Sequence, residues 1–447
     1  MTPPKDKLMA RVLRSSAITM GGYGVSQILR LASNLILTRL LYPEAFGMMA
    51  LVSVFLMGLA MFSDIGLGPA IMGSKRGDDP AYLDTAWSIQ ILRGLILWGA
   101  ALVLTWPVAL FFGEPDLLHY LPVAALGLVI AGFTPTRRET ANRHLMAGRV
   151  TLVDLAAQIV ALVTGVVLAW ATQSIWSLVV SGLVGHLATL ILLDLCLPGR
   201  RNRWHWEKAA ASELIHFGKW IFLATVMGFA IGQADKVILG RVLDLRSYGQ
   251  FNIAFFLAAF PLMVGTMVMW RVLIPVFRSA PPKDDPANFR HIRKLRAGAA
   301  GFLIALLVLV SFIGDWLVGL MYDADYALAG GMVVMMAAMQ VPSAIILTCD
   351  QAALAAGDSR RFFIFTAVRA TTVTLGILLG WQAFGLIGAF VGQGLGNLLA
   401  YPALAWLLKP HGAWDPKLDA GLFLSGTALC LIGLWLNLDA VAALGHL

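Results

Sequence analysis

The sequence predicts an all-α integral membrane protein with about thirteen transmembrane helices. Hydrophobic residues make up 59% of the 447 positions and charged residues only 13%, and the mean hydropathy is +0.78. A soluble domain carries about 25% charged residues. This composition predicts a chain that folds within a lipid bilayer, and the length and spacing of its apolar segments support that class.

Each apolar segment is long enough to cross the hydrocarbon core, which takes about 20 residues of α-helix. A closed β-barrel would instead show short segments of alternating hydrophobicity. We therefore expect helices near 14–41, 45–73, 85–112, 117–136, 150–171, 174–197, 217–241, 248–277, 297–321, 328–356, 361–383, 385–408 and 418–436.

The loops alternate in charge along the chain. GSKRGDD, PTRRETANRHLMAGR and PGRRNRWHWEK are basic, whereas the intervening FFGEPDLLHY, ATQS and MYDADYALAG are short and neutral or acidic. Basic loops stay on the cytoplasmic side, so we expect a multi-pass protein with a cytoplasmic N-terminus. The net charge of +8 then reports topology, and we expect no nucleic-acid partner.

Several functional classes are disfavoured by what the loops and cysteines contain. No loop between the predicted helices exceeds about twenty residues, which leaves no room for a soluble catalytic domain. Cys196, Cys349 and Cys430 lie far apart and match no metal or redox spacing. The start, MTPPKDKLMARVLR, is followed by a full-length span rather than a cleavage site. We expect a first helix that stays as an anchor, no catalytic residues, no metal and no cofactor.

An internal repeat divides the chain into two halves. ILTRLLYPEAFG (36–47) recurs as ILGRVLDLRSYG (238–249), with five identical positions, and GVVLAW (165–170) pairs with GILLGW (376–381). Two six-helix halves share one orientation, as in transporters built from parallel repeats. We predict an N-terminal six-helix bundle over 1–200, a cytoplasmic interfacial linker over 201–215, a C-terminal six-helix bundle over 216–410 and an accessory helix over 411–447.

A polar stripe follows one face of the first helix. Its members Tyr23, Gln27, Arg30 and Asn34 are spaced i, i+4, i+7 and i+11. An arginine at the centre of a membrane helix costs about 2.5–3.5 kcal/mol, so such a stripe should face a cavity or the interior of a bundle. We expect it to bind an anionic cargo; an ion pair of Arg30 with a carboxylate that joins two helices is the alternative.

Further polar residues lie inside other predicted spans. Lys236 occupies the position of the repeat that matches Asn34, and Gln233 shares its side of the helix. Arg93 and Arg369 are candidates for a secondary role in binding, with snorkelling toward the membrane interface as the alternative for both. Gly388, Gly392 and Gly396 form a ridge of small residues that permits close helix contact.

Two acidic residues are placed deepest among the predicted spans. Asp64 and Asp235 are candidates for binding a coupling ion, Na⁺ or H⁺, or for pairing with a buried arginine. The sequence leaves these two possibilities open.

Three segments carry a resemblance to a known family. FSDIGLGPAIMGSKRGDDPAYLDTAWSIQILRGLIL (62–97) resembles the helix 2–3 signature of Wzx-like polysaccharide-transport and oligosaccharide-flippase proteins. RRETANRHLMAGRVTLVDLAAQIVALVTG (137–165) resembles their helix 4–5 connection, and QADKVILGRVLDLRSYGQFNIAF (233–255) their helix 7–8 turn. That family belongs to the multidrug/oligosaccharidyl-lipid/polysaccharide (MOP) exporter superfamily.

The resemblance implies a fold and an activity. The fold would be two pseudo-symmetric six-helix bundles in a V around a central cavity that opens alternately to each side. The activity would be transfer of a polyprenyl-diphosphate-linked oligosaccharide from the cytoplasmic to the outer leaflet of the bacterial inner membrane, for exopolysaccharide or O-antigen synthesis. Implied partners are this lipid-linked oligosaccharide, membrane lipid and possible polysaccharide polymerase and export machinery.

Two other functions remain as alternatives. A cation-coupled multidrug exporter of the same fold would favour an acidic, aromatic cavity, and Asp64 and Asp235 are compatible with it. A membrane glycosyltransferase, polymerase or ligase would need catalytic acids or a sizeable outer loop, and the outer loops here are short. The basic residues of the first predicted helix favour the flippase.

Overall fold

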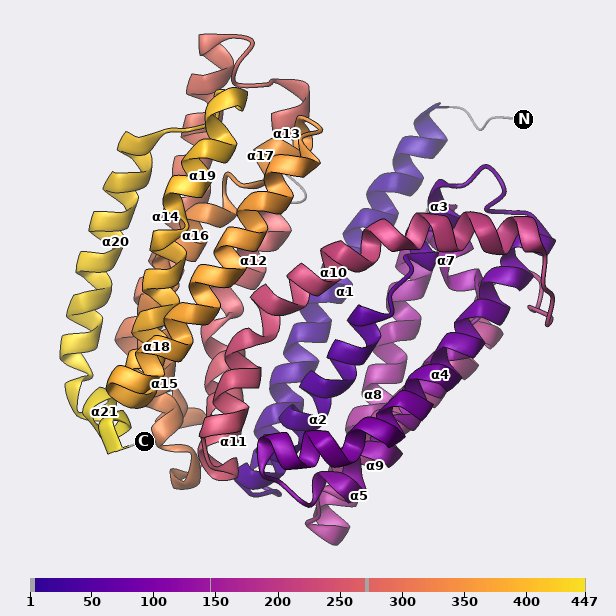
Figure 1. The fold of residues 1–447 in the computed structure, drawn as a ribbon, viewed down its shortest axis with the longest axis horizontal. Helices are drawn as coiled ribbons and strands as arrows, with labels where there is room; N and C mark the ends of the chain where they lie inside the picture. Colours follow the sequence, from indigo (N-terminus) through magenta and orange to yellow (C-terminus); the bar gives the residue numbers. More distant parts are fainter. Residues whose placement is uncertain (1–4, 145, 270–272, 447) are drawn as a thin grey trace. The chain divides into compact units, whose positions relative to one another are not determined.

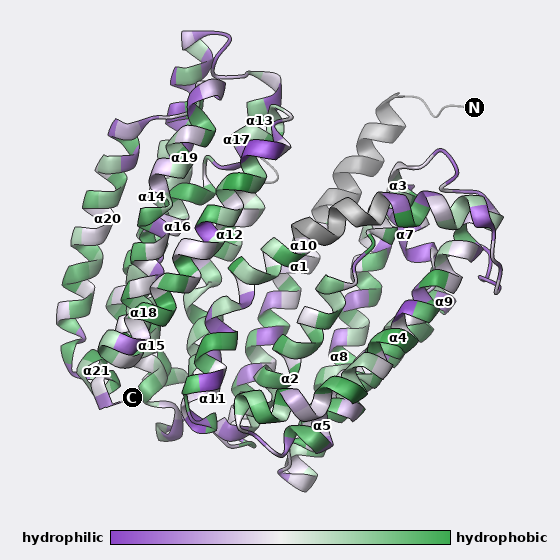
Figure 2. Ribbon diagram, in the orientation of Figure 1, coloured by the Kyte–Doolittle hydropathy of each residue, from purple (hydrophilic) through white to green (hydrophobic). Residues whose placement is uncertain are grey.

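The protein is an all-α membrane protein, as predicted. The structure is a computed structural model that describes residues 5–144, 146–269 and 273–446, and the side chains of these except residues 5–17, 217–224 and 268. Within this part of the chain every regular element is helical. Hydrophobic residues cover the helices, and hydrophilic residues gather in the loops at their ends (Figure 2).

The chain divides into two compact units, Met1–Val226 and Met227–Leu447. The first contains α1 (Lys5–Thr38), α2 (Pro43–Phe62), α3 (Leu67–Gly73), α4 (Pro80–Phe112), α5 (Leu117–Ala124), α6 (Leu126–Gly132), α7 (Arg137–Arg143), α8 (Ala147–Thr172) and α9 (Trp176–Cys196) (Figure 1). The division falls inside α10 (Lys208–Val242), which is one continuous helix.

The second unit combines two long helices, α14 (Pro286–Met321) and α18 (Ser359–Leu399), with many short ones. In chain order its elements are α11 (Leu245–Ala258), α12 (Phe260–Val268), α13 (Ile274–Ser279), α14, η2 (Ala324–Tyr326), α15 (Leu328–Met339), α16 (Val341–Leu347), α17 (Gln351–Ala355), α18, α19 (Tyr401–Leu408), η3 (Lys409–His411), α20 (Pro416–Leu436), α21 (Leu438–Ala442) and η4 (Ala443–His446). The predicted accessory segment, α20, packs against α14, α15 and α16 and so belongs to this unit.

Each expected apolar segment coincides with one helix or with two or three successive helices, and the expected segment 45–73 is broken between α2 and α3. Seven helices of the described chain are long and apolar enough to cross a membrane, or up to ten when each bent pair counts as one span. The expected spans 361–383 and 385–408 are joined within α18 and α19, and the spans 14–41 and 217–241 correspond to α1 and α10, whose side chains are described only in part.

Aspartate–proline pairs begin three of the long helices. Asp79, Asp285 and Asp415 cap α4, α14 and α20, each accepting a hydrogen bond from a backbone N–H of the first turn. A proline follows each aspartate at the first helical position, where its missing N–H costs nothing. This local chemistry explains why these helices begin where they do.

The repeated segments occupy equivalent places in the two halves. Residues 36–47 cover the end of α1 and the start of α2, and residues 238–249 cover the end of α10 and the start of α11. One copy therefore connects α1 to α2, and the other connects α10 to α11.

The predicted glycine ridge is confirmed as a close helix contact inside α18. The chain reverses where Phe384 and Gly385 have non-helical backbone angles, with a φ of 58° at the glycine. In the resulting hairpin a Cβ on Gly392 would collide with the carbonyl oxygen of Gly376, and one on Gly388 with that of Gly380. Only glycine allows the two arms to approach this closely.

Candidate substrate-binding site

A polar cavity lies within the second unit, between helices that are distant in sequence. Its volume is about 260 Å³, and α10, α11, α12, α15, α16 and α18 contribute to its wall. The polar side chains that line it are Asp235, Thr266, Gln340, Ser343, Arg369, Gln393 and Asn397. Such a mixture of apolar wall and few convergent polar groups is typical of a ligand site.

Arg369 is held in this cavity by the opposite arm of the α18 hairpin. Its Nε donates to Oδ1 of Asn397 at 2.8 Å, and Nδ2 of Asn397 donates to the carbonyl oxygen of Gln393 at 2.9 Å. The terminal nitrogens of Arg369 make no hydrogen bond to any residue that the structure describes. Asp350, buried before α17, lies close enough for its charge to act on Arg369.

Lys236 and Gln233 do not line this cavity, but Lys236 contacts Phe255, which does. Nζ of Lys236 donates to Oε1 of Gln233 at 3.1 Å and sits 4.2 Å from the centre of the Phe255 ring, which lines the cavity. The Tyr248 hydroxyl donates to the carbonyl oxygen of Lys236 at 3.0 Å and fixes the backbone there. The buried carboxylate of Asp235 accepts the backbone N–H of Lys236 at 2.8 Å.

The polar stripe of α1 belongs to the first unit. Tyr23 and Arg30 are exposed, and Gln27 and Asn34 are half-buried. A different face of α1 packs on α8, where Ser26 donates to Oε1 of Gln158 at 2.7 Å. The four predicted residues therefore share one side of α1, different from the side that carries Ser26.

Arg93 binds the end of α2 rather than a cavity. Its Nε donates to Oγ of Ser63 at 2.9 Å, and its Nη2 donates to the carbonyl oxygen of Ala60 at 2.6 Å. The last carbonyl groups of a helix have no partner within the helix, and a cation there also meets the negative end of the helix dipole. Arg93 thus stabilises the point where α2 ends.

Asp64 does not lie within a continuous helix, which corrects the prediction of one span over 45–73. The helix breaks after Phe62, and Oδ1 of Asp64 accepts the N–H of Gly66 at 2.8 Å. Gly66 has a φ of 61°, a left-handed conformation that glycine adopts without strain, and α3 begins after it. Asp64 therefore forms a turn, with the charge of Arg93 nearby.

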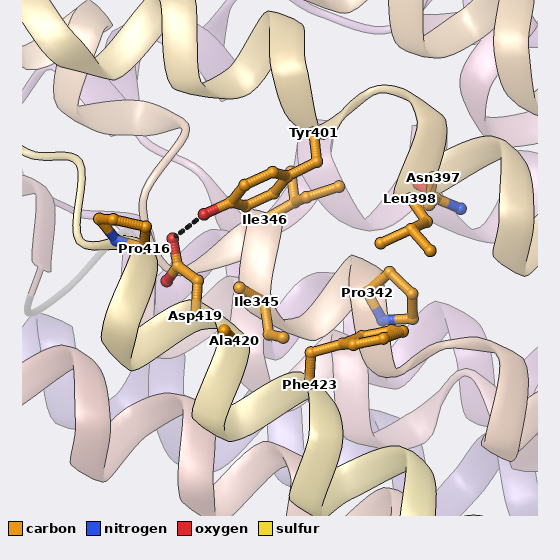
Figure 3. A pocket seen from close by; sticks show the side chains of 10 residues that line it. All are labelled: Pro342, Ile345, Ile346, Asn397, Leu398, Tyr401, Pro416, Asp419, Ala420 and Phe423. Atoms are coloured by element: carbon orange, nitrogen blue, oxygen red, sulfur yellow. Dashed lines mark hydrogen bonds between the residues drawn. The ribbon is translucent and has the colours of Figure 1, made fainter.

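A second, apolar cavity adjoins the polar one and shares Asn397 with it. It measures about 290 Å³ and is lined by Pro342, Ile345, Ile346, Asn397, Leu398, Tyr401, Pro416, Asp419, Ala420 and Phe423 (Figure 3). At one end the Tyr401 hydroxyl donates to Oδ2 of Asp419 at 2.9 Å. Asp419 also pairs with the buried Arg296 at 2.8 Å, so its charge is compensated inside the protein.

Sequence reasoning missed several residues of these cavities. Gln340 is the residue between α15 and α16, and Ser343 lies in the first turn of α16. Gln393 and Asn397 are spaced i, i+4 on the second arm of α18. The spacing of Gln393 and Asn397 was a usable signal, because two amides on one face of an apolar helix need polar partners. Oε1 of Gln340 is buried and has no hydrogen-bond partner among the described residues.

Comparison with known proteins gives the family. The family model described as "Polysaccharide biosynthesis protein" matches residues 36–329, about two thirds of the chain. The lipopolysaccharide biosynthesis protein WzxC of Escherichia coli K12 is 23% identical over 268 residues, covering 59% of this chain and 53% of WzxC. The succinoglycan biosynthesis transport protein ExoT of Rhizobium meliloti 1021 is 23% identical over 243 residues, covering 54% of this chain and 49% of ExoT. The chain thus spans about half the length of the curated relatives it matches.

Solved structures share the fold. The inward closed conformation of the lipid II flippase MurJ superposes with a TM-score of 0.72 at 12% identity, over 96% of this chain and 98% of MurJ. A point mutant of the Vibrio cholerae MATE transporter VcmN gives a TM-score of 0.58 at 13% identity, over 91% and 98% of the two chains. The predicted family is confirmed: this multi-pass membrane protein is a member of the polysaccharide biosynthesis protein family.

Proposed function

We propose that the protein is a flippase that moves a polyprenyl-diphosphate-linked oligosaccharide between the leaflets of the bacterial inner membrane by alternating access. The family match supports a role in polysaccharide biosynthesis. A relative named as a transport protein and a fold shared with a lipid II flippase support translocation rather than catalysis. The basic loops support a cytoplasmic N-terminus, and in this proposal transport runs toward the outer leaflet.

The observation that carries this proposal is the pairing of a polar and an apolar cavity through one residue, Asn397. A lipid-linked oligosaccharide has an anionic diphosphate between an apolar chain and a sugar. The terminal nitrogens of Arg369 are available to the diphosphate, and the apolar cavity fits the first isoprenoid units. Guanidinium groups suit phosphate because they present a planar fork of donors.

Gln393 in the cavity wall, and Lys236 with its partner Gln233 behind Phe255, supply further polar groups for the head group. A diphosphate carries about two negative charges, and placing them in a medium of low dielectric is costly unless cations compensate them. Lys236 and Arg369 provide two such cations. On the first unit, Arg30, Tyr23, Gln27 and Asn34 form a separate polar surface whose chemistry suits a sugar or its charge.

Asp235, in the wall of the polar cavity, and Asp350, whose charge acts on Arg369, suggest how transport is driven. Both are buried, and Oδ1 of Asp350 has no hydrogen-bond partner among the described residues. A buried carboxylate can bind a proton or Na⁺, so exchange of such an ion would change the charge next to Arg369 and Lys236. In this proposal Na⁺ or H⁺ couples to release of the anionic cargo, which then passes to polymerase and export machinery.

The second candidate function is a cation-coupled multidrug exporter. The shared fold with a MATE transporter and the buried Asp235 in the wall of the cavity favour it. Arg369 in the same wall disfavours a cationic drug, because like charges at close range repel.

Reconstitution separates these functions. Purified protein in liposomes that carry a labelled polyprenyl-diphosphate oligosaccharide should expose the label on the opposite leaflet faster than protein-free liposomes, with imposed Na⁺ or H⁺ gradients changing the rate. Gradient-driven export of a cationic dye without movement of the lipid would instead establish the exporter. Elongation or transfer of the glycan by the purified chain would show an enzyme and refute both.

A further inference from the structure

A third cavity lies in the first unit, far in sequence from the candidate substrate site. It measures about 390 Å³ and is formed by α4, the connection after α6, α9 and the segment that follows α9. Its lining residues are Trp87, Phe133, Pro135, Leu190, Ile191, Asp194, Leu195, Arg201 and Asn202. The cavity is amphipathic: its wall along α9 is largely apolar, and its charged residues lie at the end near Arg201.

The apolar wall of this cavity belongs to a lipid-facing surface. α9 is the least buried of the seven clear spans, with 11% of its most apolar stretch inside the protein. Ile191 and Leu195 on its last turns are 54% and 71% exposed. Apolar side chains of a transmembrane helix that the protein leaves exposed contact acyl chains, so the cavity opens toward lipid.

The polar end of the cavity carries more positive than negative charge. Asp194 pairs with both Arg201, at 3.0 Å, and the buried Arg137, at 3.3 Å. The exposed Arg203 adds a third guanidinium, which pairs with no carboxylate that the structure describes. Two guanidinium groups thus share one carboxylate, and Arg203 adds a third guanidinium. An anion can neutralise this surplus of positive charge.

The segment that carries these arginines is fixed in place. The backbone N–H groups of Arg203, His205 and Glu207 donate to Oδ1 of Asp84, Oγ of Ser88 and Oγ1 of Thr85 at 3.0–3.1 Å, all on the first turns of α4. Alternate N–H groups pointing to one side mean an extended chain, whose successive side chains face opposite ways. The exposed Trp204 and Trp206 therefore share one face of this extended segment, residues 201–207, which we call the strap.

Tryptophan and arginine together mark the level of lipid head groups. Trp side chains concentrate where the bilayer meets water, and arginine binds phosphate through its fork of donors. Trp87 adds a third indole at the cavity; its Nε1 donates to the carbonyl oxygen of Phe133 at 3.2 Å, which holds the ring in the wall. These features occur where α9 ends and the chain becomes polar.

We propose that this cavity binds an anionic glycerophospholipid of the leaflet on the basic side, as a resident lipid distinct from the transported cargo. Its phosphate contacts Arg201 and Arg203, one acyl chain fills the cavity beside Ile191 and Leu195, and Trp87 packs at the glycerol level, while Trp204 and Trp206 lie on the other face of the strap. The bound lipid fixes the strap to the membrane surface.

Native mass spectrometry of the full-length protein, titrated with phosphatidylglycerol and with phosphatidylcholine, tests this assignment. Wild type should hold phosphatidylglycerol at a saturable site and phosphatidylcholine only weakly. Arg201→Gln/Arg203→Gln should bind phosphatidylglycerol at least about tenfold more weakly, because the variant loses its charge-assisted hydrogen bonds to the phosphate. Both side chains are exposed, so folding should be retained.

The matched control is Arg290→Gln/Lys294→Gln, which removes two exposed charges from the basic start of α14. It should bind phosphatidylglycerol as wild type does. Equal losses in both double variants would show general charge attraction and overturn the proposal, as would an unchanged Arg201→Gln/Arg203→Gln variant. Binding at these arginines of a polyprenyl diphosphate but not of phosphatidylglycerol would make the cavity a cargo site and also overturn it.

Discussion

Arg369 and Asn397 face each other across the α18 hairpin, with Nε of the arginine 2.8 Å from Oδ1 of the asparagine. The glycine contacts lie between this pair and the turn of the hairpin, and they bring the two arms close enough for the bond to form. The bond orients a cation into the polar cavity, and Asn397 also borders the apolar cavity.

Asn397→Leu removes the acceptor of Arg369 while keeping the size of the side chain. An unfixed guanidinium loses its orientation, and the hydrogen bond to a charged group is worth about 1.5–3 kcal/mol. The rate of lipid exposure in the liposome assay should therefore fall about tenfold or more. Asn397→Asp, which retains the acceptor, should keep more activity than Asn397→Leu; the reverse order would contradict this role.

Gly392→Ala should destabilise the second unit through the hairpin. The added methyl group would collide with backbone of the opposite arm, and overpacking of this kind costs about 1–3 kcal/mol. Gly421→Ala on α20 is the control, because open space surrounds that glycine. Thermal unfolding in detergent should show a lower melting temperature for Gly392→Ala only, and equal melting temperatures would rule out the tight contact.

The buried pair of Arg296 and Asp419 predicts a strong coupling between α14 and α20. Each side chain is only 2% exposed, and Arg296 also donates to the carbonyl oxygen of Ala413. Arg296→Met leaves a buried carboxylate without its partner, which costs about 3–5 kcal/mol. The double variant Arg296→Met/Asp419→Leu should melt above either single variant. Additive losses in this double-mutant cycle would show that the pair is not coupled.

The ion pairs at the start of α4 predict a loss of stability in acid. Nη1 and Nη2 of Arg76 contact both carboxylate oxygens of Glu207, at 2.9 and 2.7 Å, and its Nε contacts Asp79 at 3.0 Å. These hydrogen bonds hold the pKa of Asp79 and of Glu207 below their ordinary values. Because the folded state then binds fewer protons, the pairs stabilise it above about pH 4 and lose this contribution as the pH falls further.

A comparison with Arg76→Gln isolates this contribution. The difference in melting temperature between wild type and the variant should be present at pH 7 and shrink as the pH falls below about 4. The groups are at the surface, so added salt should also reduce the difference. A difference that persists unchanged at pH 3 would mean that Arg76 acts through packing rather than charge.

The membrane class, the positions of the helices and the glycine contact were predictable from the sequence, because each depends on local composition or spacing. Apolar length identifies a span without knowledge of its neighbours, and three glycines at i, i+4 and i+8 indicate close packing of some kind. The polar face of α1 was predictable for the same reason, since helical periodicity alone places Tyr23 and Arg30 on one side.

The composition of the cavity was not predictable, because it depends on which helices become neighbours. Gln340, Ser343 and Asn397 come from three separate elements, and only the fold brings them to Arg369. Arg93 shows the same difficulty. Its position suggested binding or snorkelling, yet its partners Ser63 and Ala60 exist only because α2 ends at Phe62, inside an apolar run that reads as continuous.

The central claim is that Arg369 handles the anionic part of a lipid-linked cargo. The most direct measurement is the initial rate at which a labelled polyprenyl-diphosphate oligosaccharide becomes exposed on the opposite leaflet of liposomes containing wild type, Arg369→Gln or the control Arg290→Gln, at matched insertion. The account predicts rapid exposure by wild type and Arg290→Gln and a rate for Arg369→Gln that is lower by about tenfold or more, from the loss of charge-assisted contacts to phosphate. Full activity of a correctly inserted Arg369→Gln protein would contradict it.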